Sequence, residues 1–202
     1  MDTAARTQTL GIAMRRLFCG GLLVLLCVAL AGCGEDTKPA SAFKTIEQTK
    51  PDLTGADPRL ATIFRQAGDL LGGGRDAYDA RIESLDGIPI VVNKWGSWCG
   101  PCRREFPLFQ RMAKQFGGEV AFLGVNLMDS RDAADEFLTE MPVPYPSYID
   151  DKLEISKLLR PVQGAPTTAF YTKEGVLIKV KIGEYPTLDL LRKDIEEQAL
   201  QR

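Results

Sequence analysis

Two cysteines separated by two residues are the side chains of this sequence best suited to chemistry. Cys99 and Cys102 stand in the run Trp98-Cys99-Gly100-Pro101-Cys102, and no other cysteine follows position 33. The apolar run 88–95 predicts a strand that delivers Cys99 to the first turn of a helix. Unpaired N–H groups and the helix dipole stabilise a thiolate there. The pair therefore suits thiol–disulfide exchange, with Cys99 as the nucleophile and Cys102 as the buried resolving thiol.

The 202-residue chain contains no histidine, which removes several other kinds of site. Ser-His-Asp and Cys-His catalytic groups and His-ligated zinc are excluded. Two cysteines supply only half of a structural zinc site, and a c-type haem site needs a histidine where Arg103 stands. We therefore predict no metal and no cofactor. The net charge of −2, without a basic stripe, argues against nucleic acid as a partner.

The N-terminal part of the chain has the pattern of an export signal. Arg15 and Arg16 precede the uncharged run 17–30, and Met14 is a plausible true start. A 14-residue helix is about 21 Å long, shorter than the roughly 30 Å hydrocarbon core, so the run predicts a signal peptide.

The run ends in Leu30-Ala31-Gly32-Cys33, which resembles the lipobox of bacterial lipoproteins. In that family the peptide is cut before the cysteine, which then carries lipid. The resemblance implies a signal peptide over 1–32, lipidation of Cys33, and a catalytic domain held at the cell membrane on its extracytoplasmic side. An ordinary secretory signal and an uncleaved anchor are the alternatives. Residues 33–58, which are polar and contain three prolines, predict the lipidated cysteine followed by a flexible linker.

Residues 59–202 have the pattern of one globular α/β domain. Alternating strands and helices, followed by a hairpin and a last helix, predict a central mixed sheet with helices on both faces. Helices are expected over 59–72, 76–85, 102–116, 132–141, 151–159 and 187–200, and strands over 88–95, 120–126, 147–149, 167–172 and 176–182.

Several motifs together resemble the thioredoxin fold. These are the cysteine strand, the Trp-Cys-Gly-Pro-Cys run and Gly164-Ala165-Pro166-Thr167 ahead of the hairpin. More narrowly, residues 85–200 resemble the TlpA/ResA-like, membrane-tethered thiol–disulfide oxidoreductases of bacteria, including their extra helix and short strand at about 129–149. The positions that carry this resemblance are Asn93, Trp95, Trp98, Cys99, Cys102, Glu105, Phe106 and Pro107.

Two departures from that pattern stand out. Thioredoxin has a buried acid at the position of Asn93, so a proton acceptor for Cys102 must come from elsewhere. The N-terminal hairpin usual in the family is not evident, and helices over 59–85 are expected in its place.

The resemblance implies roles for residues around the cysteines. Pro166 is expected to be cis and to lie against the cysteines, leaving the backbone of Ala165 to pair with a substrate strand. Glu105 is a candidate catalytic residue that tunes the cysteine pKa values or passes a proton to Cys102, although it also suits a plain partner of the helix dipole. The substrate-binding set is then Trp98, Gly100, Pro101, Ala165 and Pro166.

By resemblance, the function is a protein disulfide reductase fed with electrons by a membrane thiol-transfer protein. Its clients would be exported cysteine-containing proteins, apocytochromes c among them. One alternative, a peroxiredoxin-like peroxidase, would want Pro at Val92 and Thr or Ser at Gly96. The other, a copper(I) metallochaperone, would use the two thiolates as soft ligands, although such relatives have a wider cysteine spacing and a histidine. The direction of electron flow is left open.

Overall fold

The computed structural model describes residues 42–160 and 164–202 of the chain. The expected signal peptide, the expected lipidation site Cys33 and the first part of the expected linker lie outside these ranges. Among the described residues, none of the helices combines the length and hydropathy that crossing a bilayer requires.

A mixed sheet forms the centre of the described domain, as expected. Its order is β1-β4-β3-β2-β5-β6, in which β1, β4, β3 and β2 pair in parallel and β5 and β6 pair antiparallel to their neighbours. The strands are β1 (Leu70–Leu71), β2 (Ile90–Trp95), β3 (Ala121–Leu127), β4 (Ser147–Asp150), β5 (Thr167–Tyr171) and β6 (Leu177–Ile182). Every residue of β2 and β3 is buried, which explains why both strands are largely apolar.

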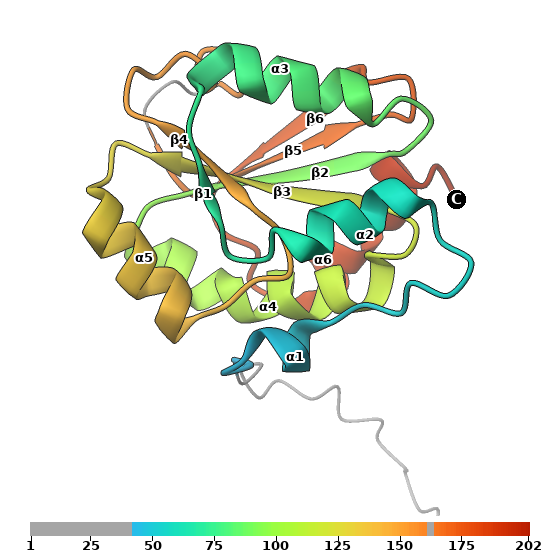
Figure 1. Cartoon of the computed structure of the whole chain (residues 1–202), viewed down its shortest axis with the longest axis horizontal. Coiled ribbons are helices and arrows are strands. Elements are labelled where there is room, and N and C mark those ends of the chain that lie inside the picture. Colours follow the sequence, from blue (N-terminus) through green and yellow to red (C-terminus); the bar gives the residue numbers. More distant parts are fainter. Residues whose placement is uncertain (1–41, 161–163) are drawn as a thin grey trace, which may run out of the picture. The chain divides into compact units, whose positions relative to one another are not determined.

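Helices cover both faces of this sheet, which confirms the predicted α/β layers. α3 (Gly74–Ser84) lies on one face, whereas α4 (Gly100–Phe116) and α6 (Leu188–Asp194) lie on the other (Figure 1). α6 continues as the π-helical turn Ile195–Ala199. On the α4 face, the rings of Trp95, Phe106 and Phe137 pack together, and Phe137 belongs to α5 (Arg131–Glu140).

The helix predicted over 59–72 is wrong in its second half. α2 (Pro58–Arg65) ends early, and Gly68 turns the chain with a φ of 76°, a conformation that favours glycine. Leu70 and Leu71 then form β1, which pairs in parallel with β4. Two adjacent leucines suit an edge strand as well as a helix face, so their spacing misled the prediction. The missing N-terminal hairpin is thus replaced by α2, this short strand and α3.

The helix predicted over 151–159 is also wrong. Residues 151–160 form a series of turns, in which Leu153 has a φ of 60°. The carboxylate of Asp150 accepts hydrogen bonds from the N–H groups of Ile155 and Ser156, five and six residues further on. Asp150 therefore closes a wide loop instead of capping the first turn of a helix, where the bonded N–H lies two or three residues away.

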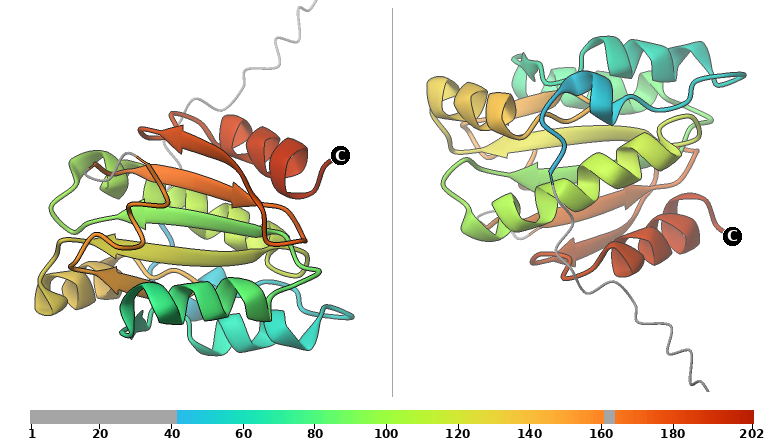
Figure 2. Two further views of the ribbon diagram at one scale, coloured as in Figure 1. Left: turned by 90° about the horizontal axis from the view of Figure 1, so that it is seen from above. Right: turned by 90° about the horizontal axis from the view of Figure 1, so that it is seen from below.

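The described part of the expected linker, residues 42–58, is folded against the domain, so this prediction is corrected. It carries α1 (Ile46–Thr49), capped by Thr45, and the buried residues Thr49 and Pro51. Figure 2 shows α1 lying beside α4. The buried amide of Gln110 accepts from the N–H of Phe43 and donates to its carbonyl oxygen, at 2.7 and 3.1 Å. We call residues 42–52 the N-terminal arm.

Candidate redox site

Cys99 and Cys102 form a disulfide at the start of α4, where the sequence placed them. Their Sγ atoms are 2.00 Å apart and their Cα atoms 5.2 Å apart. Cys99 is the N-cap residue of α4, and its Sγ accepts the N–H of Cys102 at 3.1 Å. Gly100 and Pro101 form the first helical turn between the two cysteines. A thiolate released at Cys99 would keep this N–H donor and the positive end of the helix dipole, and both stabilise its negative charge.

Both cysteines are buried in this disulfide form, so Cys99 is hardly more exposed than Cys102. Cys99 is 3% exposed and Cys102 is fully buried. Trp98, by contrast, is 56% exposed beside them, which suits an apolar contact for a client.

The loop before Cys99 is fixed by hydrogen bonds from the segment that follows β3. The carboxylate of Asp129 accepts from the backbone N–H and the hydroxyl of Ser97, at 2.6 and 2.7 Å. The indole N–H of Trp98 donates to the carbonyl of Leu127 at 3.2 Å. The indole folds over Gly96, where an added Cβ would lie 2.6 Å from its ring. Asp129 was not predicted from the sequence, because nothing in its neighbourhood along the chain marks it.

Pro166 lies at the same end of the sheet as the disulfide. The Ala165–Pro166 peptide bond is cis, as the resemblance implies. Thr167 pairs with Lys94 in β2, one residue before Trp95 at the strand end that leads to the cysteines. The carbonyl of Pro166 accepts from the N–H of Gly183 at 3.0 Å, which ties this turn to the loop after β6. Pro166 is buried and Ala165 is half-buried.

Glu105 is fully buried one helical turn after Cys102. Its Oε1 accepts from the Nδ2 of Asn93 at 2.8 Å, and its Oε2 accepts from the N–H of Tyr185 at 3.0 Å. Burial raises the pKa of the Glu105 carboxyl to about 7, although these two hydrogen bonds and the charge of Lys181 act in the opposite direction. The buried acid that Asn93 lacks in β2 is thus supplied from α4.

Arg103 and Arg104 lie on the exposed side of α4, and both are paired with acidic side chains. Arg103 contacts Glu140 and lies over the ring of Phe137. Arg104 donates two hydrogen bonds to Glu184, at 2.8 and 2.9 Å. The carboxylates of Glu140 and Glu184 therefore partly neutralise these two arginines, which weakens the electrostatic effect of the arginines on Cys99.

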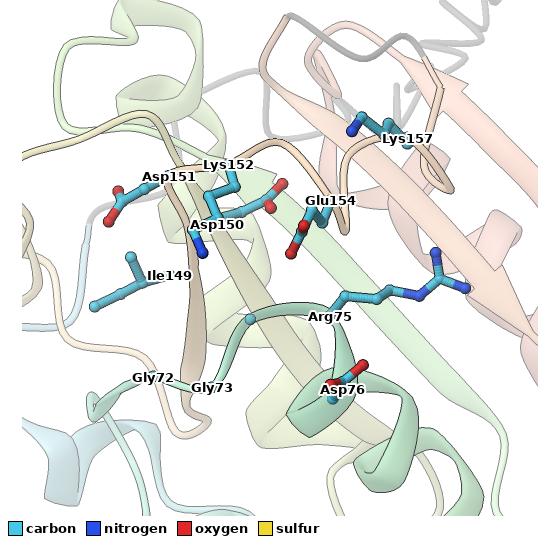
Figure 3. A pocket seen from close by; sticks show the side chains of 11 residues that line it. Gly72, Gly73, Arg75, Asp76, Ile149, Asp150, Asp151, Lys152, Glu154 and Lys157 are labelled. Carbon is cyan, nitrogen blue, oxygen red and sulfur yellow. The ribbon is translucent and has the colours of Figure 1, made fainter.

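A cavity of about 830 Å³ opens elsewhere, between the start of α3 and the segment after β4 (Figure 3). Charged side chains line it, including Arg75, Lys152 and Glu154. None of the residues predicted for the redox site is among its lining residues. In residues 42–160 and 164–202 no group of three or more His, Cys, Asp or Glu side chains is arranged to hold a metal ion.

Comparison with known proteins finds thiol–disulfide oxidoreductases among the relatives of this chain. Thiol:disulfide interchange protein HelX of Rhodobacter capsulatus is 34% identical over 135 residues, covering 61% of this chain and 74% of HelX. DsbE of Pseudomonas aeruginosa is 39% identical over 93 residues, with coverages of 46% and 50%. Thiol-disulfide oxidoreductase ResA of Bacillus subtilis is 32% identical over 111 residues, with coverages of 54% and 62%. The chain thus spans between half and about three-fifths of the length of DsbE and ResA.

A solved structure supports the fold. MTB DsbF, in its mixed oxidised and reduced forms, matches with a TM-score of 0.52 and 30% identity, over 56% of this chain and 82% of that one. The fold is therefore thioredoxin-like, and the resemblance to ResA-like oxidoreductases is confirmed. The model of the AhpC/TSA family matches residues 65–180, more than half of the chain. The relatives described above are named thiol:disulfide interchange proteins and a thiol–disulfide oxidoreductase, and the chain itself belongs to the AhpC/TSA family.

Proposed function

We propose that this protein is a thiol–disulfide oxidoreductase that reduces disulfides in exported proteins while tethered to the cell membrane. The observation that carries the proposal is the Cys99–Cys102 disulfide at the N-terminus of α4, with the buried carboxyl of Glu105 one turn below it. The names of HelX, DsbE and ResA support the same chemistry. Apocytochromes c are among the clients we propose, and a membrane thiol-transfer protein is the electron donor.

Reduction of a client disulfide by Cys99 and Cys102 takes place in two exchange steps. The Cys99 thiolate attacks one sulfur of a client disulfide, which forms a mixed disulfide and releases the other client sulfur as a thiolate. Cys102 then loses its proton to the Glu105 carboxylate and attacks the Sγ of Cys99. The Cys99–Cys102 disulfide forms, the second client thiolate leaves, and the client has gained two electrons. The membrane donor restores the two thiols by the reverse exchange.

The Trp98 side chain argues against the peroxidase alternative. A Thr or Ser at position 96 would place its Cβ 2.6 Å from the indole that now covers Gly96. Such a side chain could enter only if Trp98 moved away. The thiol–disulfide proposal needs no such rearrangement.

Trapping of mixed disulfides tests the proposal. Cys102→Ser keeps the attacking sulfur but removes the resolving one, so exported cysteine-containing proteins and one membrane donor should remain bound to Cys99. Cys99→Ser is the matched control and should trap neither. The wild-type protein should be mostly reduced in cells and should become oxidised when the trapped donor is deleted.

Other outcomes would overturn the proposal. A mostly oxidised population that traps proteins still awaiting their first disulfide would mean an oxidase. Stoichiometric copper in the purified protein, together with no trapped client, would favour the metallochaperone.

A further inference from the structure

Lys181 lies in one row of the sheet with two polar residues beneath α4. In the strand register, Asn93 of β2 pairs with Thr168 of β5, and Thr168 pairs with Lys181 of β6. Residues paired across neighbouring strands point to the same face of the sheet. Glu105 of α4 reaches this row, and its carboxylate accepts a hydrogen bond from the side-chain amide of Asn93. A lysine therefore stands on the sheet face that holds the buried carboxyl.

The ammonium group of Lys181 holds the loop 183–185. It donates to the carbonyl oxygens of Gly183 and Glu184, and its Nζ lies 4.2 Å from the centre of the Tyr185 ring. The same loop donates the N–H of Tyr185 to Glu105 and the N–H of Gly183 to Pro166. Lys181 thus fixes the backbone that contacts both Glu105 and the cis-proline turn.

The charges around Glu105 come from several elements. Lys181 supplies the positive charge that favours the Glu105 carboxylate, and Glu184 opposes it while bound to Arg104. Burial lowers the pKa of Lys181, but Glu105, Asp194 and Glu184 all favour its charged form. The titratable and charged groups that face Glu105 or Lys181 are Cys102 and Arg104 of α4, Tyr145 before β4, Glu184 and Tyr185 after β6, and Asp194 of α6.

Lys179 shows that the effect is particular to position 181. It lies two residues earlier on the same strand and therefore on the same face. Its Nζ pairs with Asp194 at 2.7 Å, and its charge is not among those acting on Glu105.

We propose that Lys181 is a positioning residue of the redox site, which holds the loop 183–185 against Glu105 and keeps that carboxyl ready to accept the proton of Cys102. Its role in the reaction rests on the proposed function, whereas its effect on Glu105 does not. It acts through Glu105 and through the backbone N–H of Tyr185, without touching the sulfurs.

The test is the titration of Glu105 by carbon-13 NMR in the full chain in detergent, with the signal assigned by its loss in Glu105→Gln. Lys181→Met should move the Glu105 midpoint from about 7 to about 8, because a nearby opposite charge is lost. Lys181→Gln, which keeps a donor for the loop but no charge, should also raise it. Lys181→Arg should restore a midpoint near that of the wild type, and Lys179→Met should leave it in place.

Hydrogen exchange separates the two parts of the role. The N–H of Tyr185 should exchange faster in Lys181→Met, which cannot hold the loop, than in Lys181→Arg. An unchanged Glu105 midpoint in both Lys181→Met and Lys181→Gln would overturn the proposal, as would an equal rise in Lys179→Met. These measurements need no client protein. Failure of the trapping experiment would therefore refute the proposed function without affecting the test of Lys181.

Discussion

The carboxyl of Glu105 makes the stability of the protein depend on pH. Its pKa is about 7 in the folded protein and about 4.5 when exposed. The folded state therefore keeps a proton that the unfolded chain has lost between these values. The free energy of unfolding should fall by about 3 kcal/mol as the pH rises through that window.

Glu105→Gln should remove this dependence, because an amide does not titrate. Asn93 can turn its Oδ1 toward the new amide, and that oxygen has no other partner in the described part of the chain. Urea denaturation across the window from pH 4.5 to 7 measures the effect, with Glu136→Gln on the exposed side of α5 as the control. A variant with the wild-type slope would show that Glu105 does not carry the proton.

Gly96 is the residue on which the placement of Trp98 depends. In Gly96→Ala, the new Cβ would lie 2.6 Å from the indole, so the ring must move and lose its hydrogen bond to Leu127. We expect faster reduction of the Cys99–Cys102 disulfide by a small thiol and a loss of about 1–3 kcal/mol of stability. Gly72→Ala is the control, because Gly72 is exposed away from the cysteines and an added Cβ would meet no atom within 4 Å. Equal rates in the two variants would contradict this role of Gly96.

At the scale of elements, side chains of α4 hold the N-terminal arm, and the buried one among them that bonds its backbone is Gln110. Gln110 bonds both backbone groups of Phe43 and also donates to the carbonyl of Pro142 at 2.7 Å. Gln110→Ala should release the arm and cost about 1–3 kcal/mol, because the Pro142 carbonyl stays buried without this donor.

Hydrogen exchange at the Phe43 amide measures this release. The rate should rise strongly in Gln110→Ala and stay low in Gln115→Ala, whose side chain is exposed on the same helix. Proteolysis within residues 42–50 should follow the same order. A protected Phe43 amide in Gln110→Ala would mean that other contacts hold the arm, such as those of Lys114 with the Gln48 carbonyl and the Phe43 ring.

The sequence predicted elements well where a single periodicity dominated. β2 and β3 follow from largely apolar runs, and α4 follows from one apolar helix face. The failures occurred where two structures share one pattern. Leu70 and Leu71 fit a helix or an edge strand, and only pairing with β4 decides between them.

The residues of the redox site also divide into those that the sequence predicts and those that it does not. The motif around the cysteines places Cys99, Cys102 and Glu105, because their spacing is local to one helix, and the Ala-Pro motif places Pro166. Asp129 follows β3, 30 residues after Cys99, and Lys181 lies in β6, 79 residues after Cys102. Nothing along the chain indicates that these two side chains meet the site, because only the arrangement of the strands brings them there.

At the scale of the whole molecule, the run Leu30-Ala31-Gly32-Cys33 predicts attachment to the membrane through a lipid on Cys33. With Cys33 cleaved and lipidated, the mature protein should partition into detergent, because two or more acyl chains anchor firmly at about 0.8 kcal/mol per buried CH₂. Cys33→Ala should be soluble or unprocessed, whereas Cys27→Ala should behave as the wild type. Mass spectrometry that finds an unmodified N-terminus, or an intact segment 17–30, would refute this proposal.

If the chain is anchored through Cys33 as proposed, docking of the N-terminal arm on α4 would limit the distance between the domain and the membrane. A linker from Cys33 to Pro58 would stretch to roughly 85 Å, whereas the chain from Cys33 to Ala42 stretches to roughly 30 Å at most. Because Gln110 binds the arm, the tether would join the domain at α4, the helix that begins at the disulfide. An anchored domain would therefore be confined to a shallow layer above the bilayer. In that layer it would meet a membrane-embedded donor at high local concentration, and distant proteins would have to come to it.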